Sequence, residues 1–448
     1  MITAALALMA AMPVTPAGAV TLMEALAKAY INNPTLLADR ARQRATDEQV
    51  PQALSKWRPE VTLSGEISRE RVYNPSASEV VQYRTPRTGE IIVDQPVYRG
   101  GRTVAQTRRA EAQVQAGRAD LVGTEQDVLQ DGVRAYMNVL RDQAVLDLNI
   151  RNEQRLRSQL QAARDRFQVG EVTRTDVSQA EARHSRSTAD RIQAEGDLIS
   201  SRAVYRRVIG EAPAKLTPPQ PIESLPRTEQ EAEDSARTQN PEVLSARFDE
   251  ESARHNVDLI RGELLPEISL RGSFSKDEEI SSSTRQRETA EIIAELTVPL
   301  YQSGSVYSRL RQAKETGSQR RLELAEAERN SVEAATRAWE NLQTAKARVQ
   351  SFEAEVRADK IALEGVQIEA QVGSRTVLDV LDAEQELLDA QVSLVRSQRD
   401  VIVAGFDLLA AIGRLTARDL KLPVTLYDFE INYKAVRDKW FGSGKSAE

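Results

Sequence analysis

The amino-acid sequence repeats itself once along its length, and this duplication constrains the fold more than any other feature. Asn33-Pro34 recurs 207 residues later as Asn240-Pro241. Further along the chain the spacing shortens to 203 residues, as in Val169-Gly170 and Val372-Gly373. A change of length between two copies of a repeat indicates a surface loop. The chain is therefore predicted to contain the following parts: a first structural repeat, residues 20–225, a second structural repeat, residues 226–422, and a C-terminal tail, residues 423–448.

Both repeats predict the same order of elements, in which a strand hairpin separates a helical segment from a helical hairpin. From Gly101 to about Gln168 the sequence has no proline, and Leu, Val and Ala recur at helical spacing. Such a helix would be about 100 Å long, and the two shorter helices of the repeat, placed end to end, would match it. The predicted ranges are a helical segment at residues 20–57, strands at about residues 59–71 and 88–98 with a polar loop at residues 73–88 between them, and in the second repeat strands at about residues 266–276 and 289–300.

The predicted strands have one apolar and one polar face. In PEVTLSGEIS, which starts at Pro59, the side chains of Val61, Leu63 and Ile67 share one face, and PEISLRGSFS, which starts at Pro266, repeats the pattern. Strands of about 8 to 11 residues with this alternation are typical of a water-filled barrel in lipid. Unpaired edges cost several kcal/mol per backbone group in hydrocarbon, and the smallest single-chain barrels have about eight strands. Four strands per chain therefore predict a sheet completed by other copies, with two soluble hairpins packed on the helices as the alternative.

The composition favours long helices and argues against several classes of protein. Aromatic residues make up 4% and charged residues 28%, which is typical of helical bundles and coiled coils. A net charge of −7 without a basic patch argues against nucleic acid as a partner, and the absence of cysteine excludes disulfides and a lipid-carrying cysteine. Residues 1–19 are apolar and end in Ala17-Gly18-Ala19, which predicts a signal peptide, with a buried N-terminal helix as the alternative.

Together these features resemble the TolC family of outer-membrane efflux and type I secretion channel proteins. The resemblance extends from residue 20 to about residue 422. It depends on the duplication, the Asn-Pro pairs, the Val-Gly turns and the prolines at the predicted helix–strand borders: Pro59, Pro96, Pro266 and Pro299.

The resemblance implies a mainly α fold with a membrane β part, assembled as a homotrimer. Long antiparallel helices would form a trimeric α-barrel in the periplasm, and four β-strands per chain would contribute to a shared 12-stranded transmembrane β-barrel. The family function is that of a passive exit duct in the cell outer membrane, without enzymatic activity or cofactor. A periplasmic membrane-fusion adaptor protein and an inner-membrane transporter, either ABC or proton-driven, would open it, and outer-membrane lipid would surround the strands.

The candidate site residues fall in the two glycine turns. Asp379 and Asp382 share one face of the first turns of a helix, where acids are favourable, and by spacing alone they could be solvated helix-start residues. The resemblance implies instead that they form a ring of carboxylates at the periplasmic entrance, which would favour cations. It also assigns entrance-closing links to Arg375 and, on the acceptor side, to Asp176 with Thr175 beside it.

A non-pore periplasmic coiled-coil scaffold protein is the alternative from another functional class. A scaffold explains the helices but not two strand hairpins at matching positions. It also leaves unexplained the aromatic residues at the strand–helix junctions, Trp57, Tyr98 and Tyr301, where contact with the lipid interface is expected. No nucleophile accompanies the acids of the second turn, so we expect no enzyme. Either small toxic compounds or an exported protein is compatible with the sequence as cargo.

Overall fold

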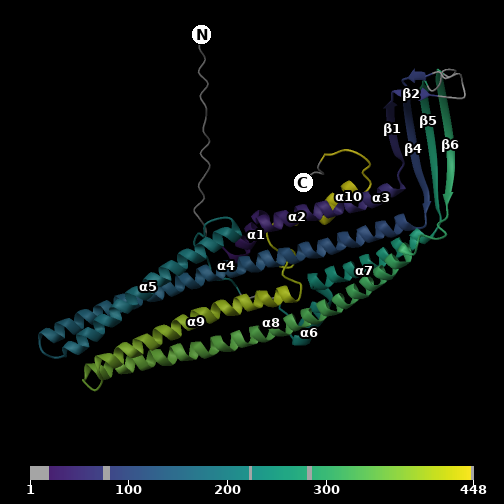
Figure 1. Cartoon of the computed structure of the whole chain (residues 1–448). Coiled ribbons are helices and arrows are strands. Elements are labelled where there is room, and N and C mark those ends of the chain that lie inside the picture. The colour runs from purple at the N-terminus through teal and green to yellow at the C-terminus, as the bar shows by residue number, and fades with distance from the viewer. Residues whose placement is uncertain (1–19, 74–80, 221–224, 280–284, 445–448) are drawn as a thin grey trace, which may run out of the picture. The chain divides into compact units, whose positions relative to one another are not determined.

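The computed structural model describes residues 20–73, 81–220, 225–279 and 285–444 (Figure 1). The predicted signal peptide, residues 1–19, and part of the loop predicted at residues 73–88 lie outside the described residues. The chain divides into two compact units, and both sequence repeats contribute to each unit. Unit 1 contains Met1–Asp39, Val122–Pro241 and Arg329–Leu426, and unit 2 contains Arg40–Leu121, Glu242–Glu328 and Tyr427–Glu448.

Unit 1 is built from helices, and its main feature is a pair of helical hairpins, α4–α5 and α8–α9, whose turns lie at the same end (Figure 1). The long helices predicted from the proline-free stretches are confirmed, because α4 and α8 contain 67 residues each. The helices of unit 1, of which α2, α4 and α8 continue into unit 2, are α1 (Leu22–Asn32), α2 (Pro34–Asp47), α4 (Arg102–Gln168), α5 (Arg174–Ile209), α6 (Glu229–Gln239), α8 (Ser305–Gln371) and α9 (Val377–Ala411).

The repeated Asn-Pro pair divides the helix that the sequence predicted as one segment over residues 20–57. Asn33 is extended (φ −68°, ψ 122°), because the residue before a proline avoids the helical region. Its side-chain amide donates to the carbonyl of Val208 at 3.0 Å, near the end of α5. In the second repeat Asn240 is also extended and donates to the carbonyl of Ala411 at 3.0 Å, at the end of α9. The predicted segment therefore consists of α1, α2, α3 (Gln49–Leu54) and the short 3-10 helix η1 (Ser55–Trp57).

Tyr136 of α4 holds the start of the described chain against the segment that follows α5. Its ring is fully buried, and its hydroxyl donates a bifurcated hydrogen bond to the carbonyls of Val20 at 2.8 Å and Thr217 at 2.7 Å. The same hydroxyl accepts a hydrogen bond from the amide of Thr217 at 3.1 Å. Val20 also forms a parallel β-bridge with Leu216. One buried tyrosine thus joins both ends of the first repeat to its long helix.

Unit 2 carries the four main predicted strands in one antiparallel sheet of the order β1-β4-β5-β6. The hairpins of the two repeats join where β4 pairs with β5. Within the described residues, neither β1 nor β6 has a second neighbouring strand, so each leaves one edge unpaired. The strands are β1 (Glu60–Ile67), β4 (Arg87–Arg99), β5 (Glu267–Glu278) and β6 (Gln286–Thr297), close to the predicted ranges.

The stretch predicted as a loop at residues 73–88 contains one strand that the sequence analysis missed, and the single strand predicted at residues 59–71 is divided into two. β2 (Glu70–Tyr73) pairs with β3 (Val81–Arg84) in a separate two-stranded sheet. An ion pair crosses this sheet from Arg84 to Glu70 at 2.7 Å. Both strands have only four residues, which is too short for an alternating pattern to stand out from polar neighbours.

The predicted C-terminal tail contains a helix, α10 (Phe429–Arg437), that packs in unit 2 beside α3. Its Asn432 donates at 2.7 Å to the carboxylate of Asp47, which is 1% exposed and also accepts from Gln43 at 3.0 Å. Its Glu430 forms an ion pair with Arg118 of α4 at 2.6 Å. The other short elements of unit 2 lead into β5 and are α7 (Pro241–Arg261) and η2 (Gly262–Leu264).

Candidate functional site

The two hairpin turns of unit 1 have the same local structure. Gly170 and Gly373 adopt left-handed φ angles of 83° and 79°, which favour glycine. In the first turn, Asp176 closes a capping box by accepting hydrogen bonds from the amide of Thr173 at 2.8 Å and from its hydroxyl at 2.7 Å. These bonds lower the pKa of Asp176, with the side-chain bond from Thr173 as the largest cause. The carboxylate is therefore held by its own turn.

The second turn repeats this arrangement with Asp379. Its carboxylate accepts from the amide and the hydroxyl of Thr376, both at 2.8 Å. The backbone hydrogen bond from Thr376 is the largest cause that lowers the pKa of Asp379, and the positive charge of Arg375 adds to it. The ionised form of Asp379 is therefore favoured more strongly than that of a free aspartate.

Asp382, one turn further along α9, does not take part in the cap. It forms an ion pair with Arg183 of α5, which joins the α4–α5 hairpin to the α8–α9 hairpin close to their turns. The sequence analysis did not identify Arg183, because no spacing rule connects residues in different repeats. The only available signal was its position shortly after the first turn, on the helix equivalent to that of Asp382.

The residues predicted to close the entrance contact other partners within this chain. Arg375 donates to Glu369 at 2.9 Å, within its own turn, and this bond raises the pKa of Arg375. The carboxylate of Asp176 accepts a hydrogen bond from Thr173, and Thr175 is exposed in the first turn of α5. The structure thus places the three predicted residues at the turns but does not pair Arg375 with Asp176 inside one chain.

The strand register collects apolar side chains on one side of the four-stranded sheet, which we call the apolar sheet face. Leu63 pairs with Ile91, Ile91 with Phe274, and Phe274 with Ala290. On the opposite face Arg271 forms an ion pair with Asp94 at 2.7 Å. The large residues of the apolar sheet face are all exposed in the single chain: Val61, Leu63, Ile67, Ile91, Val93, Ile268, Leu270, Phe274, Ile292 and Leu296.

A bulge in β4 determines where one predicted interfacial aromatic lies. The register shifts between Pro96 and Tyr98, so Pro96 faces Ser269 and Tyr98 faces Ile268. The extra residue turns Tyr98 onto the apolar sheet face, whereas strict alternation would have placed it on the opposite face. Trp57 ends η1 and Tyr301 follows β6, and both are exposed.

The four prolines occupy three kinds of position. Pro59 and Pro266 stand between a 3-10 helix and the strand that follows it. Pro299 follows the end of β6, whereas Pro96 lies inside β4 at the bulge.

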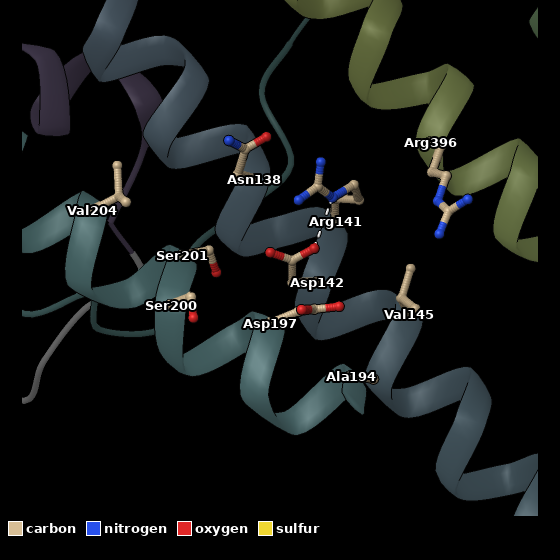
Figure 2. Close-up of a pocket in the computed structure, with 10 residues that line it drawn as sticks. All are labelled: Asn138, Arg141, Asp142, Val145, Ala194, Asp197, Ser200, Ser201, Val204 and Arg396. Carbon is tan, nitrogen blue, oxygen red and sulfur yellow. Dashed lines mark hydrogen bonds and ion pairs between the residues drawn. The ribbon is translucent and has the colours of Figure 1, made fainter. Parts of the chain in front are cut away.

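A polar pocket of about 510 Å³ lies between α4 and α5 in unit 1, with Arg396 of α9 at its side (Figure 2). Arg141 and Asp142, which are neighbours in α4, form an ion pair at its wall at 2.7 Å. Ser200 and Ser201 donate to carbonyls of their own helix at 3.0 Å, so their hydroxyls are not aligned as nucleophiles. Among the described residues there is no group of three His, Asp or Glu that could hold a metal ion.

No helix in the described part of the chain combines the length and the apolar character required to cross a membrane.

Comparisons with known proteins match nearly the whole chain. The sequence profile of a family described as outer membrane efflux protein matches residues 25–211 and 233–414. The chain is 38% identical to the outer membrane efflux protein BepC of Brucella suis, over 94% of this chain and 91% of BepC. It is 28% identical to the outer membrane protein TolC of Vibrio cholerae, over 89% of this chain and 92% of that protein. Among solved structures, the CmeC outer membrane channel of Campylobacter jejuni matches with a TM-score of 0.80 at 16% identity, over 93% of this chain and 89% of CmeC.

Proposed function

Because the chain belongs to the outer membrane efflux protein family, we propose that three copies of it assemble into one passive channel-tunnel. The protein is an outer-membrane channel of efflux or secretion systems, and its helices form the periplasmic extension. A periplasmic membrane-fusion adaptor and an inner-membrane transporter, ABC or proton-driven, open the duct and supply the energy. The duct itself performs no catalysis. The alternative of a scaffold without a pore does not account for the family membership.

The unpaired edges of the sheet are the observation that most strongly supports an assembly of three copies. In lipid, each unpaired backbone group costs several kcal/mol, and β1 and β6 each have a whole edge without a described partner. If β6 of one copy pairs with β1 of the next, both edges are satisfied and the apolar sheet face remains continuous toward lipid. Three copies of four strands then give the twelve strands that the resemblance implies.

Paired cysteines test this assembly directly, because the native chain has none. Within one chain β4 and β5 separate β1 from β6. At about 4.8 Å per strand spacing, the two outer strands are about 14 Å apart, beyond the reach of a disulfide. Leu63→Cys is therefore combined with one cysteine at a time along β6, such as Ala294→Cys. The pair that lies in register should yield disulfide-linked oligomers of three chains in native envelopes.

The matched control places both cysteines on strands that neighbour each other within one chain. Leu63 and Ile91 are direct partners in the β1–β4 pair, so Leu63→Cys with Ile91→Cys should give monomers with an internal disulfide. If every β1–β6 pair also stayed monomeric under oxidation, the trimer would be refuted.

At the turns we propose the roles that the resemblance assigns. Asp379 and Asp382 of the three copies form a ring of carboxylates that favours cations, so replacing both by alanine should shift the reversal potential toward zero in a salt gradient. Arg375 and Asp176 form links between neighbouring copies in the closed entrance. Arg375→Ala or Asp176→Ala should then raise single-channel conductance in planar bilayers, and wild-type conductance in both variants would reject these links.

A further inference from the structure

The segment that follows α10 carries two adjacent exposed aromatic side chains. Trp440 is 64% exposed and Phe441 is 90% exposed, in a chain whose aromatic content is only 4%. The segment is held in place, because Arg58 donates to the carbonyl of Lys439 at 2.6 Å and its guanidinium lies over the Trp440 ring at 4.9 Å. The aromatic pair is therefore presented at a fixed position on unit 2.

That position coincides with the water-facing end of the apolar sheet face. Arg58 follows Trp57 at the end of η1, and β1 begins at Glu60. The first large residue of the apolar sheet face is Val61, which is exposed. Trp440 is tied to Arg58 and thus lies beside the residues that lead into β1, where the apolar sheet face begins.

Two exposed lysines accompany the aromatic pair. Lys56 lies within η1, and Lys439 directly precedes Trp440. Tryptophan prefers the boundary between hydrocarbon and headgroups, and lysine chains can extend along such a boundary so that the ammonium group reaches a phosphate. Aromatic rings with neighbouring basic groups fit an anionic phospholipid better than water or a neutral protein surface.

We propose that Trp440 and Phe441, with Lys56 and Lys439, form an anchor for anionic phospholipid headgroups on the periplasmic surface of the outer membrane. The anchor ties the C-terminal segment to the membrane at the foot of the sheet. It depends on the outer-membrane location of the chain and not on the identity of the cargo or on the proposed entrance residues.

The three tryptophans of the chain allow a direct measurement. The full chain is reconstituted into vesicles of phosphatidylethanolamine and phosphatidylglycerol whose acyl chains carry bromine either near the headgroup or near the methyl end. In the Trp57→Phe, Trp339→Phe variant only Trp440 fluoresces, and we expect about a twofold loss of emission with bromine near the headgroup and a smaller loss with deep bromine. The matched control, Trp57→Phe with Trp440→Phe, retains only Trp339 in the helical unit 1 and should not respond to either lipid.

The charge requirement is tested separately. Lys56→Gln with Lys439→Gln should reduce the quenching of Trp440 in vesicles that contain phosphatidylglycerol to the level seen in vesicles of phosphatidylcholine alone. Quenching that does not differ between the two lipid compositions in the unmodified lysine background would overturn the headgroup assignment.

If brominated lipid did not quench Trp440, the anchor would be overturned. A water-soluble quencher then shows what surrounds Trp440 instead. Strong quenching by iodide would mean a solvated segment, and protection from both quenchers would mean coverage by another protein chain. Channel conductance of the same vesicles reports insertion independently. If the phenylalanine variants fail to assemble, Phe441→Cys with a polarity-sensitive dye replaces them, with Ala435→Cys on the exposed side of α10 as its aqueous control.

Discussion

The ion pair between Arg183 of α5 and Asp382 of α9 gives the sharpest test of how the entrance is held. It joins the two helical hairpins of one chain near their turns. Arg183→Ala removes the guanidinium and leaves Asp382 at the surface, where its side chain is 51% exposed and remains hydrated. The substitution therefore removes an attraction without leaving a buried unpaired charge.

The size of the effect follows from the exposure of the pair and from the number of copies. An exposed ion pair contributes about 0.2–1 kcal/mol to the state that contains it. In the proposed trimer, an opening that separates the hairpins of all three chains together breaks three pairs, or about 0.6–3 kcal/mol. This changes the ratio of open to closed channels by roughly threefold to 150-fold. A contact that is weak in one chain thus becomes measurable in the assembly.

Open probability in planar bilayers is the appropriate readout. Arg164→Ala is the matched control, because Arg164 pairs with Glu181 at 3.4 Å within a single hairpin and is also exposed. We expect Arg183→Ala to raise the open probability and Arg164→Ala to leave it unchanged. Exchanging the charges, with Arg183→Asp and Asp382→Arg, should restore closure in part. Equal open probabilities in the two alanine variants would refute the reasoning.

Three further predictions concern stability, each measured as the temperature at which the reconstituted protein loses its helical circular dichroism. Burial raises the pKa of Glu384, whose Oε2 has no hydrogen-bond partner, so the folded protein binds the proton more tightly than the unfolded chain and stability falls as the pH rises through the folded pKa. Glu384→Gln should therefore raise the unfolding temperature at neutral pH and lose this gain in acid, whereas equal shifts at both pH values would contradict the argument. Gly413→Ala should cost roughly 2–5 kcal/mol, because φ is 79° and a Cβ would lie 2.2 Å from the carbonyl oxygen of Gln239, while Gly373→Ala in open space should cost only about 1–2 kcal/mol of backbone strain. Tyr136→Phe removes the donor to the Thr217 carbonyl, whereas the Val20 carbonyl still accepts from Thr217, and it should cost about 1–3 kcal/mol, so an unchanged unfolding temperature would exclude the role given to the hydroxyl.

The elements that the sequence predicted correctly are those with a long periodic signal. The helices α4 and α8 show their apolar period over 67 residues, and β1, β5 and β6 alternate over 8 to 12 residues, whereas β4 is less regular. The signals that failed were short. The four-residue β3 was predicted as loop, β2 was merged with the strand predicted at residues 59–71, and the breaks at Asn33-Pro34 and before η1 were merged into one helical segment.

The candidate site was predictable only where the chemistry is local. The capping acids Asp176 and Asp379 follow from a threonine three residues earlier, a spacing that the sequence displays. The Arg183–Asp382 pair joins residues 199 apart, and its existence depends on how α5 packs against α9. The anchor around Trp440 likewise depends on Arg58, which is 381 residues from the carbonyl that it binds. Contacts of this kind arise from tertiary packing and have no spacing signature.

The duplication also shows where the two repeats have ceased to be equivalent. At the spacing of 203 residues, Asp382 corresponds to Gln179 and Arg183 corresponds to Glu386. The helix faces that meet within one chain therefore carry an arginine and an aspartate. In the proposed trimer the equivalent faces meet again between chains, and there they carry a glutamine and a glutamate, which cannot form an ion pair. The Arg183–Asp382 link therefore exists only at the contact within one chain, whereas the contact between chains depends on the proposed Arg375–Asp176 links. The two kinds of contact can accordingly be weakened one at a time: Arg183→Ala loosens the two hairpins of one chain, and Arg375→Ala loosens the hairpins of neighbouring chains.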